Sequence, residues 1–238
     1  MVRQRIQIFL VLGLMVAGLR LAYVFYERHQ DEQAAAAAGK RPAANYVLNR
    51  DFYVTPKRLH PHDVASAHQL TRQPVWVKEG YRYSYYPYDE SRKRTNFAQE
   101  AGQLGPLQKL QIKDVVTSPT PGDASSKQVM ATFAENGRSY AVPIGISRGG
   151  DTSIYSDEIF YIEDPQQLYG HWPAEVWSAI EQHDVKPGMN ELQTDFAIGF
   201  GIPEDAHVSS TRTVHYANGG KPVTVVFRDG VAVQVKRG

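Results

Sequence analysis

The spacing of apolar residues changes along this chain, and that change constrains its fold more than any other feature. Between residues 73 and 164, apolar and polar side chains alternate, with Gly, Pro and Asn at short intervals, as in short β-strands. From residue 171 the apolar residues recur at helical spacing, and alternation returns after residue 211. The pattern predicts an α+β protein with a β-rich part followed by a mixed part.

The β-rich part is expected to form a small antiparallel β-barrel over residues 51–165. Asn136 and Gly137 supply the left-handed backbone that a tight hairpin turn needs, and Asp63 is the expected N-cap of a short helix ending at Leu70. Many short strands favour a closed or nearly closed barrel, because closure protects strand edges. The strands expected from the pattern are 74–77, 81–86, 107–117, 128–134, 139–144 and 153–162.

The run QPVWVKEGYRY, which starts at Gln73, precedes these short strands and resembles a bacterial SH3-type barrel. The resemblance concerns the fold pattern alone, and a shared fold does not transfer a ligand.

The mixed part, residues 166–238, begins with two expected helices. Pro173 suits a first helical turn, a Pro187-Gly188 turn follows, and Gly199 ends the second helix. Three strands are expected after it, over 211–217, 222–228 and 231–236, joined by Gly-containing turns.

Met189 comes after the turn, Pro203 after the second helix, Asn218-Gly219 before the second strand, and Phe227 and Asp229-Gly230 before the last strand. With these residues, the order of elements resembles the SmpA/OmlA (BamE-like) module. The resemblance implies an ααβββ fold and a bacterial envelope protein that binds protein and lipid without catalysis. The matched positions are turn and core residues, so they transfer no site. The chain has no cysteine and therefore lacks the lipid-anchored cysteine of that family.

Residues 1–26 are expected to form a signal-anchor or transmembrane helix, because 6–26 is almost entirely apolar and long enough to cross a bilayer. A cleaved secretory signal is the alternative. Arg3 and Arg5 are expected at one membrane interface, and Arg20, Tyr23 and Tyr26 at the other. Residues 27–50 are expected to be a linker. The location predicted is the inner membrane, single-pass, with the N-terminus inside and the later domains in the periplasm.

Composition excludes several functions. Lys plus Arg total 26 and Asp plus Glu total 25, so no bulk charge favours nucleic acid. The absence of cysteine excludes disulfides, thiolate metal sites and cysteine nucleophiles. No cofactor is expected.

Catalytic patterns are present but weak. Ser147 lies in a Gly-x-Ser-x-Gly run, but another β-pattern follows it, so a hairpin loop is expected in place of a nucleophile elbow. Four residues of types that can bind metal ions lie close together in a predicted loop: His60, His62, Asp63 and His68. They lack the His-x-x-x-His spacing that places two ligands on one face of a helix, so no metal is expected. The adjacent carboxylate pairs 157–158 and 163–164 are expected to be capping or solvated loop residues, because neighbours along a strand point to opposite faces.

The strongest binding candidate is the run YRYSYYPYDESRKR, which starts at Tyr81, because aromatic faces beside cations stack ligands or anchor partners. The alternative is that one tyrosine face fills the barrel. The predicted binding residues are Tyr81, Tyr83, Tyr85, Tyr86, Arg92 and Arg94.

These features predict a membrane-anchored bacterial envelope protein that acts as a non-enzymatic binding or assembly factor. An envelope or membrane protein is the expected partner, with anionic lipid or peptidoglycan as further candidates. The alternatives are a cell-wall glycan- or peptide-binding domain related to a hydrolase, and a structural subunit of a membrane complex.

Overall fold

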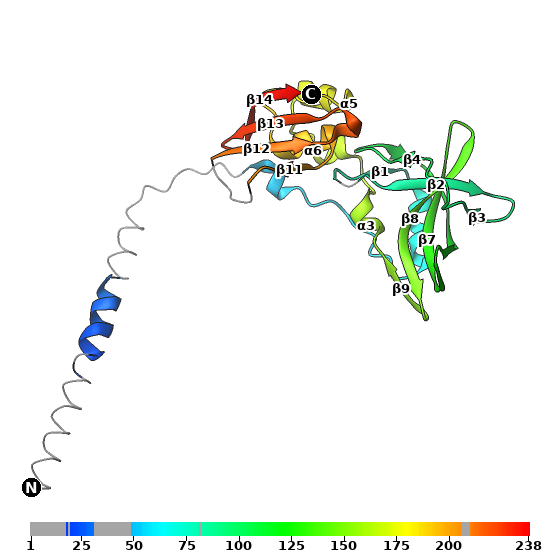
Figure 1. The fold of residues 1–238 in the computed structure, drawn as a ribbon, viewed down its shortest axis with the longest axis horizontal. Coiled ribbons are helices and arrows are strands. Elements are labelled where there is room, and N and C mark those ends of the chain that lie inside the picture. Colours follow the sequence, from blue (N-terminus) through cyan, green and yellow to red (C-terminus); the bar gives the residue numbers. More distant parts are fainter. Residues whose placement is uncertain (1–17, 19, 31–48, 81, 206–209) are drawn as a thin grey trace, which may run out of the picture. The chain divides into compact units, whose positions relative to one another are not determined.

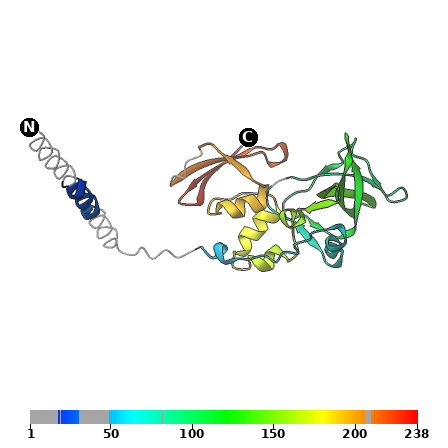
Figure 2. The same cartoon turned by 90° about the horizontal axis from the view of Figure 1, so that it is seen from below.

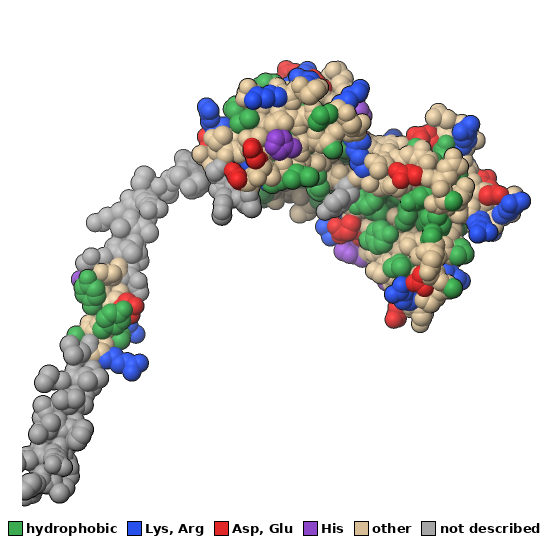
Figure 3. All heavy atoms as spheres, in the orientation of Figure 1, with side chains coloured by type: hydrophobic (Ala, Val, Ile, Leu, Met, Phe, Trp, Pro, Cys, Tyr) green, Lys and Arg blue, Asp and Glu red, His purple; other side chains and the backbone are tan. Residues whose placement is uncertain are grey.

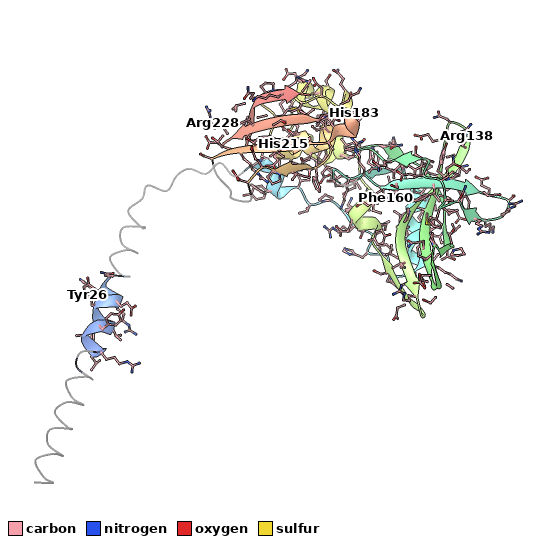
Figure 4. All side chains as sticks on the ribbon, viewed as in Figure 1. Tyr26, Arg138, Phe160, His183, His215 and Arg228 are labelled. Carbon is pink, nitrogen blue, oxygen red and sulfur yellow. The ribbon has the colours of Figure 1, made fainter. Side chains whose placement is uncertain are left out.

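The computed structural model describes residues 18, 20–30, 49–80, 82–205 and 210–238, in two compact units, Met1–Asn49 and Arg50–Gly238. In the first unit, residues 20–30 are helical and exposed, and they include Arg20 and Tyr23. Tyr26 of the same stretch is labelled in Figure 4. Among the described residues, none of the helices combines the length and the apolar composition that a membrane span requires.

The predicted transmembrane helix is therefore corrected. The described helical stretch, residues 20–30, is short and carries Arg20, Glu27 and Arg28, and charged side chains are costly in a hydrocarbon core. Residues 1–17 and 19, which include Arg3 and Arg5, lie outside the described residues.

The second unit contains three antiparallel sheets, and the largest belongs to its β-rich half, residues 54–164 (Figure 1). Its strand order is β3-β2-β8-β7-β6, with β4 paired to β2 and β9 paired to β8. The strands are β2 (Ser84–Asp89), β3 (Arg94–Thr95), β4 (Gly102–Gln103), β6 (Ile112–Thr120), β7 (Asp123–Glu135), β8 (Arg138–Arg148) and β9 (Asp151–Ile154).

The β7–β8 hairpin is the centre of this sheet. Asn136 and Gly137 have φ values of 50° and 75°, which confirms the predicted left-handed turn. Residues 129–133 of β7 are all buried, because the strand is covered on both faces.

The large sheet is not the closed barrel that the pattern predicted. Within the described residues, its strand order runs from β3 at one edge to β6 at the other without a ladder between them. The edges are bridged by buried side chains, since the hydroxyls of Thr95 and Ser118 lie 3.0 Å apart. Pro119 and Pro121 have no N–H, so the end of β6 cannot donate to a further strand there.

Short helices and a second sheet cover the β-rich half. Asp63 caps the first helix through a capping box with Ser66, as predicted. The predicted strand 153–162 is wrong, because a helical turn interrupts it and presents Asp157 to the backbone N–H groups of Leu59 and His60 at 3.2 and 2.8 Å. The elements are α2 (Val64–Ala67), η2 (His68–Arg72), β1 (Val75–Val77), β5 (Lys109–Leu110), α3 (Ser156–Ile159) and β10 (Phe160–Tyr161).

The mixed half, residues 165–238, packs two main helices against one face of a sheet of order β11-β12-β13-β14 (Figure 2). The predicted helices and the predicted strands 211–217, 222–228 and 231–236 are present, and β11 adds an edge strand that the pattern missed. The elements are α4 (Pro165–Leu168), α5 (Ala174–Glu181), α6 (Glu191–Ile198), β11 (Gly201–Pro203), β12 (Thr211–Tyr216), η3 (Asn218–Gly220), β13 (Val223–Arg228) and β14 (Val231–Arg237).

Each half has its own hydrophobic core. In the mixed half, Trp172, Phe196 and Phe227 are among the residues that fill the space between helices and sheet. The helix η1 (Arg50–Tyr53) also belongs to this half, because the Asp51 carboxylate accepts hydrogen bonds from His171, Trp172 and Asn190. Trp76 of β1 packs against the core of the mixed half, so the two cores meet through the second sheet.

Candidate functional site

The predicted aromatic strand is divided between two faces of β2. Tyr83 and Tyr85 pack against the core of the β-rich half. The Tyr85 ring lies 5.4 Å from that of Phe133 and 5.1 Å from that of Tyr140, measured between centroids. These rings therefore help to fill the core, and Tyr81 lies outside the described residues.

Tyr86 and Tyr88 point to the opposite side of β2, because successive side chains in a strand alternate. The Tyr86 ring contacts Phe97, with centroids 5.2 Å apart. Desolvation and the charge of Asp114 raise the pKa of Tyr88, which keeps its phenol neutral. These aromatic residues stand beside an open groove.

This groove, which we call the hairpin groove, has a volume of about 680 Å³ and runs between the β2–β3 hairpin and the end of β6. It lies where β3 and β6 do not pair. Prolines and aromatic rings from β2, from the segment after β3 and from the end of β6 line it. The lining residues are Pro87, Tyr88, Asp89, Arg92, Arg94, Thr95, Asn96, Phe97, Ala98, Pro119, Thr120 and Pro121.

The rim of the hairpin groove is cationic. Arg92, Lys93 and Arg94 are exposed, and Figure 3 shows blue side chains at this tip, on the right of the molecule. Among them, Arg92 lies 3.7 Å from the Asp89 carboxylate, whereas Lys93 and Arg94 form no ion pair with any described residue. Asp89 is held by hydrogen bonds from Ser91, which lower its pKa, so it stays ionised.

The groove combines four features of a recognition surface: concave shape, aromatic rings, proline surfaces and unpaired cations. It brings together Arg92 and Arg94 from the predicted set. Sequence reasoning missed Phe97, Pro119 and Pro121. Pro119 in β6 and Pro121 directly after it are the feature that could have indicated an unpaired edge.

The catalytic patterns do not assemble into a site in the described residues. Ser147 lies in β8 and accepts a hydrogen bond from Thr152 across the β8–β9 hairpin at 3.1 Å, which confirms the predicted hairpin loop. Glu163 accepts the backbone N–H of Lys57 at 2.9 Å, so it braces a loop.

The histidine cluster does not converge. His60, His62 and His68 each lie nearest a different aspartate, at 3.9, 3.8 and 3.4 Å from Asp157, Asp63 and Asp114. No group of ligand residues that could hold a metal ion is present among the described residues.

A partly buried ionisable cluster lies where the two halves meet. Glu79 accepts a hydrogen bond from the Tyr161 hydroxyl at 2.6 Å, and burial raises the pKa of Glu79. Burial, followed by the charge of Glu191, raises the pKa of Asp195 to about 8. Two carboxyls with raised pKa values can mark an active site, but they also occur at packed junctions.

Here the packed junction is the better assignment. Neither Glu79 nor Asp195 lines the hairpin groove. The neighbouring phenol of Tyr161 is buried, and Phe200 stands so close to Gly80 that a Cβ there would lie 2.6 Å from its ring. Gly80 also has a φ of 123°, a backbone conformation that L side chains rarely adopt, so glycine suits this close contact.

Fold and site together define an α+β protein of two sheet-based halves that carries an open, cationic and aromatic groove. Comparisons with protein-family models, with curated proteins and with solved structures find no match. The resemblance to the SmpA/OmlA module stays a prediction of the sequence. So does the SH3-type resemblance, although the large sheet does not close into the barrel that it implied.

Proposed function

We propose that this protein is a non-enzymatic binding factor and that its hairpin groove takes an acidic peptide segment of a partner protein. The observation that carries this proposal is the unpaired positive charge of Lys93 and Arg94 on the rim of a groove lined by Tyr88, Phe97 and prolines. Aromatic and proline surfaces bind apolar side chains, and arginine binds carboxylates through paired hydrogen bonds.

The peptide is favoured over a glycan or a lipid surface by the shape of the site. A volume of about 680 Å³ in a groove suits an extended segment with bulky side chains. Sugar recognition by stacking needs open ring faces, but the Phe97 ring of this groove is already engaged with Tyr86.

The test uses a labelled synthetic peptide in which Glu alternates with Phe and Pro, titrated with the full chain by fluorescence anisotropy. The double variant Lys93→Glu/Arg94→Glu is expected to bind at least about tenfold more weakly, because two attractive charges become repulsive. Raising the salt concentration is expected to weaken wild-type binding, since the pairs are exposed.

The matched control is Arg138→Glu/Arg228→Glu, which makes the same charge change at exposed positions of β8 and β13 (Figure 4). Equal losses in the two double variants would show that only net charge matters and would refute the groove. Preferential binding of peptidoglycan fragments, or of vesicles containing phosphatidylglycerol, would refute the peptide as the occupant.

We further propose that this factor works in the bacterial envelope. The apolar composition of residues 6–26 supports this location. Cell fractionation with antibody detection checks this location. Recovery of the full chain in the cytosolic fraction would contradict it without affecting the groove.

A further inference from the structure

A second groove lies in the same unit, between the second sheet and the helices of the mixed half. We call it the junction groove, and its volume is about 530 Å³. One wall comes from the β-rich half, with Trp76, Leu107 and Lys109, and the other comes from the mixed half. It shares no residue with the hairpin groove.

The junction groove has an apolar floor. The rings of Trp76 and Trp177 line it, together with Leu107 and Ile180. Neither indole N–H has a hydrogen-bond partner among the described residues. A cavity of this size with two indoles is typical of a site for a small ligand.

The two walls carry opposite charges. Lys109 stands on the sheet side, with its ammonium 5.2 Å from the centre of the Trp76 ring, and it forms no ion pair with a described residue. Asp164 and Glu181 stand on the helix side. Each accepts a hydrogen bond from Gln166, at 2.9 and 2.7 Å, so both carboxylates are held at that wall.

His183, which follows α5, adds a polar group to the junction groove (Figure 4). Its Nδ1–H donates to the carbonyl of Ala197 at 3.0 Å, so in the neutral ring Nε2 is free to accept. The site therefore offers an ammonium on one wall and acceptors on the other.

We propose that the junction groove binds a short zwitterionic peptide with large apolar side chains. Its carboxylate would pair with Lys109, its ammonium with Glu181 and Asp164, and its side chains would lie on the two indoles. Charge complementarity carries this choice, because a ligand with one charge alone would leave one wall unmatched. The inference does not depend on the hairpin groove.

The probe is the free dipeptide Leu-Phe, and its comparison is the same dipeptide with an acetylated N-terminus and an amidated C-terminus. Trp76 and Trp177 are two of the three tryptophans in the chain, so saturable binding is expected to change the intrinsic fluorescence. Calorimetric titration gives the affinity. The blocked dipeptide is expected to bind about tenfold more weakly, because both charged contacts are lost.

The variants Lys109→Gln and Glu181→Gln are each expected to weaken binding of the free dipeptide severalfold and to leave the blocked dipeptide unaffected. Lys113→Gln and Glu175→Gln are the controls, at exposed positions outside the groove. Thermal unfolding of each variant checks that it is folded.

Three results would overturn the proposal. The first is no saturable binding of the free dipeptide at millimolar concentrations. The second is equal binding of the free and blocked dipeptides, which would indicate an apolar site without charge recognition. The third is equal losses in the groove variants and their controls.

Discussion

Replacing Asp51 with alanine is expected to destabilise the second unit by about 3 kcal/mol, because it leaves three hydrogen-bond donors without their acceptor. The Asp51 side chain is only 7% exposed, and it accepts from His171 at 2.6 Å, Trp172 at 2.7 Å and Asn190 at 2.9 Å. Water cannot readily replace a carboxylate at this depth.

The measurement is thermal unfolding of the full chain, with an expected fall in melting temperature of about 6–12 °C. Asp151→Ala is the control, because Asp151 is exposed at the β8–β9 turn. Trp172 reports on the same site by its fluorescence. A melting temperature of Asp51→Ala equal to that of the control would show that the carboxylate does not hold η1 to the mixed half.

Replacing Asp195 with asparagine is expected to change how stability depends on pH. The folded pKa is about 8 and the ordinary value is 3.8, so between about pH 4 and pH 8 the folded state holds a proton that the unfolded state has lost. The unfolding free energy of the wild type must then fall as pH rises, by up to about 1.4 kcal/mol per pH unit.

Asparagine cannot ionise, so Asp195→Asn lacks this contribution. Its advantage over the wild type is expected to grow by about 3 kcal/mol between pH 5 and pH 8 and to level off above pH 8. Denaturant unfolding at several pH values measures the difference. Glu79 also has a raised pKa, but it is present in both proteins and largely cancels.

Asp151→Asn provides the matched control, because it makes the same substitution at an exposed position of the β8–β9 turn. Parallel curves for the wild type and Asp195→Asn would contradict the assignment of Asp195 as a carboxyl that is protonated in the folded protein at neutral pH.

Local features of the fold could be predicted because they depend on neighbours in the sequence. Asp229 and Gly230 adopt φ values of 50° and 79° at the predicted turn, and Gly199 ends α6 with a φ of 86°. The helix cap at Asp63 forms as expected. The turn and the end of α6 depend on residues that tolerate a left-handed backbone, and the helix cap depends on a side chain that accepts a hydrogen bond from a free N–H in the first helical turn.

The candidate site could be predicted only in part. The charged tip with Arg92 and Arg94 is visible in the sequence, since it is a continuous run. The opposite wall comes from Pro119 and Pro121, which reach the hairpin only through the curl of the sheet. The alternating pattern of the aromatic strand also does not show which of its two faces is buried. In the structure, the face with Tyr83 and Tyr85 packs on the core.

The sequence by itself determined the order of β-rich and mixed parts, the turns and the helix caps, because steric limits and hydrogen bonds between near neighbours act in any context. Only the tertiary structure decided that the large sheet stays open, that Asp51 gathers three distant donors, and that Trp76 and Trp177 face one groove. The physical reason is that strand pairing and burial join residues far apart in the chain, and their free energies depend on the whole packed arrangement.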